Sequence, residues 1–491
     1  MLKIKSIVIK NSIFSVLQIV LSTFCYVVIY YLILHKLGKN ELGIWSIITS
    51  LPIAISVFGS GVSGCVLRYI PVHVAQNDKK AFNQIIFNGF AFNIIFGGLI
   101  VLLGYYFSAN ILSFQFNDPQ IPNRYILLFR ISLCTFFISF ITSVLLSAID
   151  GMQLIFVRNK IVIFCSVIFC IIASILVYYY NLTGILIAQL IQSILLLISA
   201  TVILIKIDLF DFSLIKFNQI YIKLFLTYGQ GFQAISVAVL VFDPITKYFL
   251  NKYFNLSTVG IYDLVSRAVT QIRVLIVSAV QVITPFVSKS NEKCELDINE
   301  MFNKINRGAS LLSFILFSIL ISFSIIIVGY LDKNNSNQYL FILILLCISY
   351  HFNIMASTAY SILMGLGKLK NIIISHILSS IINIALFFFI GKYLIDDLVV
   401  LPIAFSIVLS SQYLIFKFKK QFNITDDVVK KSDSLVKTLS VFTIIISSIL
   451  VLLKMNTCFR IILFVFHLLV LIFLIRKNDF FANILNKISN K

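Results

Sequence analysis

The chain has 491 residues, of which 60% are hydrophobic and only 12% are charged. Soluble domains carry about 25% charged residues, so a soluble fold of this length is excluded because it could not bury so much apolar surface. The net charge of +20 does not indicate a nucleic-acid partner. The basic residues lie in short segments between apolar runs, which is where they determine membrane topology.

Apolar runs of membrane-spanning length recur along the whole chain, since about 20 mostly apolar residues suffice for one helix. The first run follows Lys3, Lys5 and Lys10 and is too long for a signal peptide. The sequence predicts an all-α polytopic membrane protein with no sizeable soluble domain. The fourteen predicted spans are 12–34, 44–66, 84–108, 125–148, 161–180, 184–205, 224–250, 259–287, 308–330, 338–364, 372–391, 398–416, 436–453 and 458–475.

Loop charges set the predicted orientation. With the N-terminus in the cytoplasm, 27 of the 39 Lys and Arg residues fall on the inside and 10 on the outside. Arg267 and Arg273 remain within a span. The positive-inside rule predicts such a bias, so we expect a multi-pass protein with both termini in the cytoplasm. Aromatic residues, among them Tyr30, Trp45 and Tyr178, fall at the predicted outer helix ends, where amphipathic rings prefer to lie.

Two segments look alike at an offset of 217 residues: Gly43-Ile44-Trp45 opens the second span and Gly260-Ile261-Tyr262 opens the eighth. This repeat predicts two six-helix lobes, 1–222 and 223–420, followed by 421–491 with spans 13 and 14 and a cytoplasmic tail. Six crossings keep the orientation, so the two bundles should be related by a pseudo-two-fold axis along the membrane normal. A cleft between two such lobes is typical of alternating-access transporters.

Charged residues inside spans need a reason, because each costs about 2.5–3.5 kcal/mol at the bilayer centre. Asp243 and Lys247 lie four residues apart around Pro244, so they can form an ion pair on one helix face. This pair could serve ion coupling, or it could only be a neutralised pair near the outer interface.

The eighth span carries a polar stripe, which predicts a helix face turned to protein or water. The stripe includes Asp263, Arg267 and Gln271, and Arg273 lies at its margin. We expect these residues to line a cavity, with an Asp263–Arg267 pair that holds helices together as the other interpretation.

Lys247, Arg68 and Arg130 complete the candidate cavity residues. The simpler interpretation of Arg68 is a positive-inside residue at the cytoplasmic end of its span. The simpler interpretation of Arg130 is a side chain that reaches the outer interface. His351, Asn353 and His376 are interpreted as core polar groups.

Neither a catalytic motif nor a metal-ligand motif is present in the sequence. The eight cysteines form no CxxC pair, the five histidines form no HExxH, and no phosphate-binding loop or nucleophile elbow occurs. We therefore expect no enzyme activity, no cofactor and no metal. Transport would be driven by an ion gradient, by the substrate gradient or by another subunit.

The chain resembles the Wzx-type polysaccharide or O-antigen flippases of the multidrug/oligosaccharidyl-lipid/polysaccharide (MOP) exporter superfamily. The resemblance rests on LGKNELGIWSIITSLPIAISVFGSGVSGCVLRYIP, on DPITKYFLNKYFNLSTVGIYDLVSRAV and on SAIDGMQLIFVRNK. In that family an aspartate late in the seventh span is followed by Gly-x-Tyr, which Asp243, Gly260 and Tyr262 match.

The resemblance implies that undecaprenyl-pyrophosphate-linked oligosaccharide moves from the cytoplasmic to the periplasmic leaflet of the bacterial inner membrane through a cationic cavity. Arginine suits a pyrophosphate because its planar fork makes charge-assisted hydrogen bonds, so Arg267 or Arg273 is expected to contact it. The implied partners are the lipid-linked oligosaccharide, membrane lipids, a coupling H+ or Na+ and a polysaccharide polymerase, with no nucleic acid.

Two other functions stay open at this point. An ion-coupled multidrug exporter of the same superfamily would need acidic side chains in its cleft to bind organic cations. The charged residues within the seventh and eighth spans are instead mainly basic. A non-transporting membrane assembly factor would have a packed core between the lobes.

Overall fold

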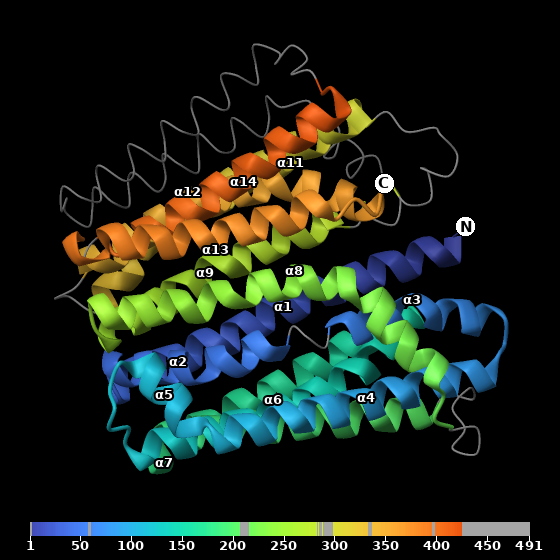
Figure 1. The fold of residues 1–491 in the computed structure, drawn as a ribbon, viewed down its shortest axis with the longest axis horizontal. Coiled ribbons are helices and arrows are strands. Elements are labelled where there is room, and N and C mark those ends of the chain that lie inside the picture. Colours follow the sequence, from blue (N-terminus) through green and yellow to red (C-terminus); the bar gives the residue numbers. More distant parts are fainter. Residues whose placement is uncertain are drawn as a thin grey trace. The chain divides into compact units, whose positions relative to one another are not determined.

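The computed structural model describes residues 2–56, 60–206, 216–281, 283, 287, 298–331, 336–394 and 398–424. These residues are nearly all helical, and no strand occurs among them (Figure 1). The helices are α1 (Leu2–Lys36), α2 (Lys39–Ser56), α3 (Ser60–Ala75), α4 (Lys79–Tyr106), α5 (Ser108–Phe116), α6 (Asn123–Gly151), α7 (Ile155–Ile205), α8 (Gln219–Tyr253), α9 (Leu256–Gln281), α11 (Ile298–Leu331), α12 (Ser336–Gly365), α13 (Lys370–Ile390), the 3-10 turn η3 (Gly391–Tyr393) and α14 (Leu401–Phe422).

The predicted fold class, an all-α polytopic membrane protein, is confirmed. Eight helical segments within the described residues are long and apolar enough to cross a membrane by themselves. The predicted spans 84–108, 125–148, 224–250, 338–364 and 372–391 coincide with observed helices to within about five residues at each end. The predicted span 44–66 is wrong as one helix, because this part of the chain forms two helices, α2 and α3, and α1 and α11 each begin ten residues earlier than predicted. The predicted spans 436–453 and 458–475 lie outside the described residues.

The chain divides into two compact units, Met1–Ile261 and Tyr262–Lys491. The predicted boundary between lobes, 222/223, lies within the first turn of α8. In the structure α8 packs against α2, α3 and α4, so it is part of the first unit. The lobes 1–222, 223–420 and 421–491, and the symmetry between them, stay predictions.

The first unit has its core between α3, α4, α6, α7 and α8. Aliphatic and aromatic side chains from these helices are almost fully buried there, among them Val66, Phe82, Val144, Cys165 and Phe225. The turn that connects α6 to α7 is closed by an ion pair of 3.4 Å between Arg158 Nε and Asp150 Oδ2. Packing of apolar faces and closed turns together fix the helices that surround the first candidate site.

A sharp reversal divides α7 into the two spans that the sequence predicts. A straight helix of its 51 residues would be about 77 Å long, more than twice the roughly 30 Å of hydrocarbon in a bilayer. Asn181 adopts φ 53° and ψ −136°, which is not a helical conformation. Gly184 then lies so close to Leu176 that a Cβ would overlap the Leu176 carbonyl oxygen. The chain therefore turns back on itself at Asn181.

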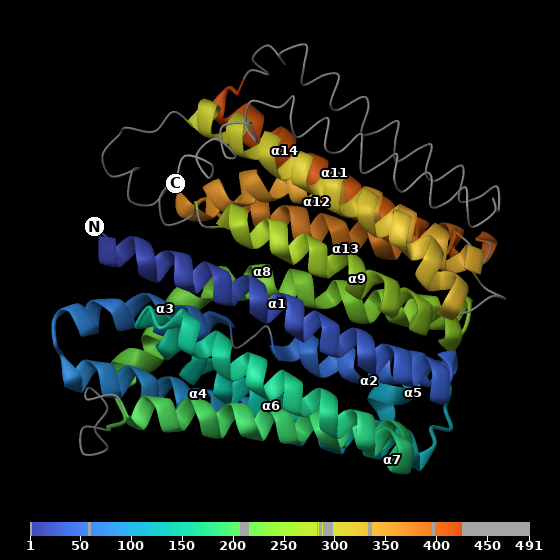
Figure 2. The same ribbon diagram turned by 180° about the vertical axis from the view of Figure 1, so that it is seen from behind.

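In the second unit α14 packs between α12 and α13, and α11 packs on α12 (Figures 1 and 2). The rings of Phe302 and Phe418 lie 5.0 Å apart and join α11 to α14. His351 of α12 is buried and pairs through Nδ1 with the Ser313 hydroxyl of α11 at 2.7 Å. His351 is thus a satisfied core polar group, as the sequence analysis expects.

The aromatic residues at the outer helix ends form two groups. Tyr178, Tyr179 and Tyr180 are exposed, which fits a lipid–water interface. Tyr30 and Trp45 are buried, and their rings meet edge to face with ring centroids 5.0 Å apart. The interpretation of Tyr30 and Trp45 as interface anchors is therefore wrong, because they pack α1 against α2.

Candidate functional site

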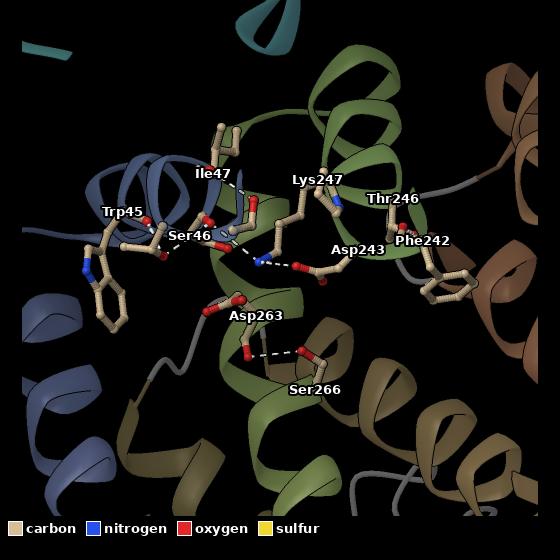
Figure 3. Close-up of polar contacts among 12 residues, drawn as sticks. Trp45, Ser46, Ile47, Phe242, Asp243, Thr246, Lys247, Asp263 and Ser266 are labelled. Carbon is tan, nitrogen blue, oxygen red and sulfur yellow. Dashed lines mark hydrogen bonds and ion pairs between the residues drawn. The ribbon is translucent and has the colours of Figure 1, made fainter. Parts of the chain in front are cut away.

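The first constellation of polar groups lies within the first unit and centres on Lys247. The Lys247 Nζ lies 2.9 Å from Asp243 Oδ2 one turn earlier on α8, and it donates to the carbonyl oxygen of Ser46 on α2 at 3.4 Å (Figure 3). Lys247 is 3% exposed, whereas the Asp243 side chain is 50% exposed. The predicted ion pair is confirmed, and its positive member is the buried one.

Pro244 lies inside α8, where the missing amide N–H of proline leaves the hydrogen-bond ladder incomplete. Gln115 of α5 donates from Nε2 to the Pro244 carbonyl oxygen at 3.0 Å. Asn251 donates in return to the Phe116 carbonyl oxygen at 3.1 Å. The short helix α5 lies between the predicted spans 84–108 and 125–148, and it fixes the part of α8 that carries Asp243 and Lys247.

Arg68 and Arg130 lie at other places in the first unit. Arg68 is exposed and its guanidinium lies 5.7 Å from the ring centre of Tyr69. It was expected to end a span, but α3 continues to Ala75. The Arg130 guanidinium stacks on the Tyr105 ring at 4.0 Å, a cation–π contact that joins α6 to α4. Both contacts fit structural roles, and cavity-lining roles stay predictions.

The second constellation lies within the second unit and centres on Arg273 of α9. Arg273 Nε donates to Asn353 Oδ1 of α12 at 2.6 Å. Asn353 Nδ2 donates to the Ser411 hydroxyl of α14 at 3.3 Å, which turns the Asn353 carbonyl oxygen toward the guanidinium. The guanidinium also lies 5.9 Å from the ring centre of Tyr350. Three helices therefore hold one cation in a defined orientation.

Arg273 has neutral partners within the part of the chain that the structure describes. Its charge also acts on Tyr360 and His376, whose rings meet edge to face at 6.1 Å. Three carboxylate ion pairs in the described part of the chain involve other cations: Arg124 with Glu41, Arg158 with Asp150, and Lys247 with Asp243.

Arg273 follows the start of α9 by 17 residues, which places it about 26 Å along the helix. A cation whose described partners are all neutral is a candidate site for an anion.

The other residues predicted on α9 differ in exposure. Asp263 is buried, Arg267 and Gln271 are half-buried, and Ser278 and Gln281 near the end of the helix are exposed. The Asp263 carbonyl oxygen accepts from the Ser266 hydroxyl at 3.1 Å (Figure 3). Cavity-lining roles for Asp263, Arg267 and Gln271 stay predictions.

Asn353 and Ser411 are the functional candidates that the sequence analysis missed. Asn353 was assigned to the core, and Ser411 was not singled out. They lie 80 and 138 residues after Arg273 in the chain, so no local spacing links them to it. The one available signal is that an asparagine inside a span needs a hydrogen-bond partner.

Comparison with known proteins bears on the fold and on the family. Residues 15–179 match the profile of the MatE family. The solved structure of the lipid II flippase MurJ in an inward closed conformation is similar at a TM-score of 0.70 and 18% identity, over 96% of this chain and 99% of that one.

An inward-facing multidrug resistance MATE family transporter gives a TM-score of 0.68 at 12% identity, covering 82% of this chain and 94% of that one. A MOP superfamily transporter from Pyrococcus furiosus gives 0.66 at 13% identity, over 85% and 96% of the two chains.

This is the fold of the MOP superfamily transporters. The chain is accordingly a multi-pass integral membrane protein. No curated protein matches the chain by sequence. At identities this low the structural matches show the fold alone, and the substrate of this chain has to be argued from its own residues.

Proposed function

We propose that the chain is a flippase that moves an anionic lipid-linked oligosaccharide, with the undecaprenyl pyrophosphate head group that the resemblance to Wzx-type proteins implies. The observation that carries this proposal is Arg273, a cation about 26 Å along α9 whose partners in the described part of the chain are neutral. A pyrophosphate would supply the missing negative charge. The lipid tail would stay in the bilayer while the head group passes between helices.

The orientation of Arg273 supports the same substrate class. Because Nε is held by Asn353, the two terminal Nη groups are the part of the guanidinium that can meet a ligand. Arginine forms two parallel hydrogen bonds to phosphate oxygens through such a planar fork. Tyr350 beside it adds an aromatic surface. This set of groups matches a phosphate at the end of a sugar chain better than an organic cation.

The second candidate is an ion-coupled multidrug exporter, which the match to the MatE profile favours. An exporter of organic cations requires an acid that is available to the drug. Asp243 meets this requirement in part, since its side chain is 50% exposed, but Lys247 at 2.9 Å already neutralises it. The charges of the described site therefore favour an anionic substrate, and Asp243 with Lys247 would instead serve coupling to H+ or Na+.

The test is deletion of the gene, followed by complementation and lipid analysis. We expect the deletion strain to accumulate lipid-linked oligosaccharide on the cytoplasmic leaflet and to lose surface glycan. Arg273→Ala should fail to restore the glycan at normal protein level, and Arg267→Ala tests the second candidate arginine. Normal glycan together with altered sensitivity to cationic drugs would instead establish the exporter.

A further inference from the structure

The short helix α5 in the first unit carries an exposed aromatic ring that is stacked on a second ring. Phe114 of α5 and Tyr248 of α8 lie parallel, with ring centroids 4.7 Å apart and planes inclined by only 4°. Tyr248 covers one face of the Phe114 ring, yet Phe114 is 67% exposed. The other face of the Phe114 ring is therefore open.

Two hydrogen bonds hold this stacked pair in place. Gln115, which follows Phe114 in α5, donates from Nε2 to the Pro244 carbonyl oxygen of α8 at 3.0 Å. Asn251 of α8 donates from Nδ2 to the Phe116 carbonyl oxygen at 3.1 Å. The end of α5 is thus fastened to α8 directly after the exposed ring. A ring fixed in this way is preorganised, so little conformational entropy is lost when a ligand stacks on it.

Polar groups surround the open ring. Asn110 and Asn117 lie about one helical turn before and after Phe114, and both are exposed. Lys252 of α8 is exposed as well, and its ammonium donates to the Tyr248 hydroxyl at 3.4 Å and lies 5.5 Å from the centre of that ring. An open aromatic face with amides and an ammonium beside it offers apolar contact and hydrogen bonds together.

A helix face that is expected to meet lipid has a different composition. Phe24 of α1 is 64% exposed, much like Phe114, and the exposed residues one turn before and after it are Val20 and Val27. The surroundings of Phe24 are therefore apolar, as lipid requires, whereas those of Phe114 are polar.

We propose that the stacked pair Phe114 and Tyr248 forms a binding platform for a sugar ring, with Lys252 and the two asparagines at its rim. A sugar ring carries C–H groups on its faces and hydroxyl groups around its edge. The C–H groups meet the negative face of an aromatic ring, and the hydroxyls meet the amides and the ammonium. Because α5 follows the third predicted span, the platform is expected on the outer side of the membrane. The inference rests on the proposed function, in which the oligosaccharide of the lipid-linked substrate reaches that side.

The test measures the binding of three probes to the full chain in lipid nanodiscs. The probes are the lipid-linked oligosaccharide from the deletion strain, undecaprenyl pyrophosphate without sugar, and the free oligosaccharide released by mild acid. Phe114→Ala should bind the lipid-linked oligosaccharide about tenfold more weakly, because the stacking surface is lost. Its affinity for undecaprenyl pyrophosphate should equal that of the native chain. Phe114→Trp keeps a flat ring and should bind the oligosaccharide at least as well as the native chain.

Two further variants distinguish a sugar platform from a membrane anchor. Phe24→Ala removes a phenylalanine of similar exposure and should leave the binding of all three probes unchanged. Phe114→Leu keeps an apolar side chain that can lie in lipid but has no flat face, so it should bind the oligosaccharide as weakly as Phe114→Ala. Native affinity of Phe114→Ala or Phe114→Leu for the lipid-linked oligosaccharide would overturn the proposal.

The three probes also separate this proposal from the proposed function. Equal affinity of the native chain for the lipid-linked oligosaccharide and for undecaprenyl pyrophosphate would overturn the platform and leave the flippase standing. Binding of the free oligosaccharide that depends on Phe114, without binding of undecaprenyl pyrophosphate, would support the platform and contradict the pyrophosphate site. A native chain that binds none of the probes would overturn both.

Discussion

Lys247 and Asp243 form an ion pair whose members differ in exposure, and the difference predicts unequal effects of removing each one. Asp243→Asn removes the carboxylate that lies 2.9 Å from the Lys247 ammonium, and Lys247 is only 3% exposed. Lys247→Met leaves a carboxylate that can still reach water. Losing the ion-pair partner is costlier for the buried ammonium, which keeps the Ser46 carbonyl oxygen, than for the exposed carboxylate. Asp243→Asn should therefore destabilise by about 1–3 kcal/mol.

The measurement is thermal unfolding in detergent, monitored through the loss of monodisperse protein as the temperature rises. Lys247→Met should unfold at a higher temperature than Asp243→Asn. The opposite order would show that Asp243, not Lys247, is the member of the pair that depends on its partner.

Asn353 positions the guanidinium of Arg273 through its amide oxygen. Replacing the amide nitrogen of Asn353 by an oxygen should turn a side chain that supports phosphate binding into one that opposes it. Asn353→Asp places a carboxylate about where the amide oxygen now accepts from Nε at 2.6 Å. The arginine would then be neutralised, and a phosphate would be repelled. A charged hydrogen bond contributes about 1.5–3 kcal/mol, which corresponds to roughly 10- to 100-fold in substrate binding.

Binding of undecaprenyl pyrophosphate to the purified protein, measured by native mass spectrometry, checks this expectation. Asn353→Ala should lose less binding than Asn353→Asp, and Asn371→Asp on the exposed start of α13 is the matched control. Equal binding by the Asn353→Asp variant and the native chain would remove Arg273 from the phosphate site.

At the scale of the element, α7 shows how a hydrophobic sequence encodes a reversal. Gly184→Ala adds a methyl group that overlaps the Leu176 carbonyl oxygen, which is backbone and cannot rotate away. We expect this variant to be destabilised by about 1–3 kcal/mol, as for overpacked sites. Gly98→Ala in α4 is the control, since its Cβ would lie 3.8 Å from Phe137 in ordinary contact.

Fluorescence-detected size-exclusion chromatography after heating compares these two glycine variants. A Gly184→Ala protein as stable as Gly98→Ala would mean that the α7 turn opens easily to admit a side chain.

The sequence predicts most helices because a spanning helix must carry about 20 apolar residues whatever its neighbours. It also predicts two separate spans, 161–180 and 184–205, and the structure reverses between them at Asn181. It does not predict α5, whose role is to contact α8 through Gln115. Arg273 was found from its place within a span, whereas Asn353 and Ser411 were not assigned to it, because such partners depend on which helices pack together.

At the scale of the whole molecule, the fold, the buried ion pair and the arginine with neutral partners belong to one account. The fold is that of MOP superfamily transporters, in which both drug exporters and a lipid flippase occur among the similar structures. Fold alone does not choose between them. We propose that the choice rests on the charges of the chain's own site, where the described partners of Arg273 are neutral.

The most direct measurement is flipping of undecaprenyl-pyrophosphate-linked oligosaccharide in proteoliposomes, read from the accessibility of the sugar to a membrane-impermeant reagent. The native chain should accelerate the exchange of the sugar between leaflets over empty liposomes. Arg273→Ala should reduce that rate at least tenfold, with Arg273→Lys between the two because it keeps the charge and loses the fork. Equal rates for the native chain, Arg273→Ala and empty liposomes would contradict the account.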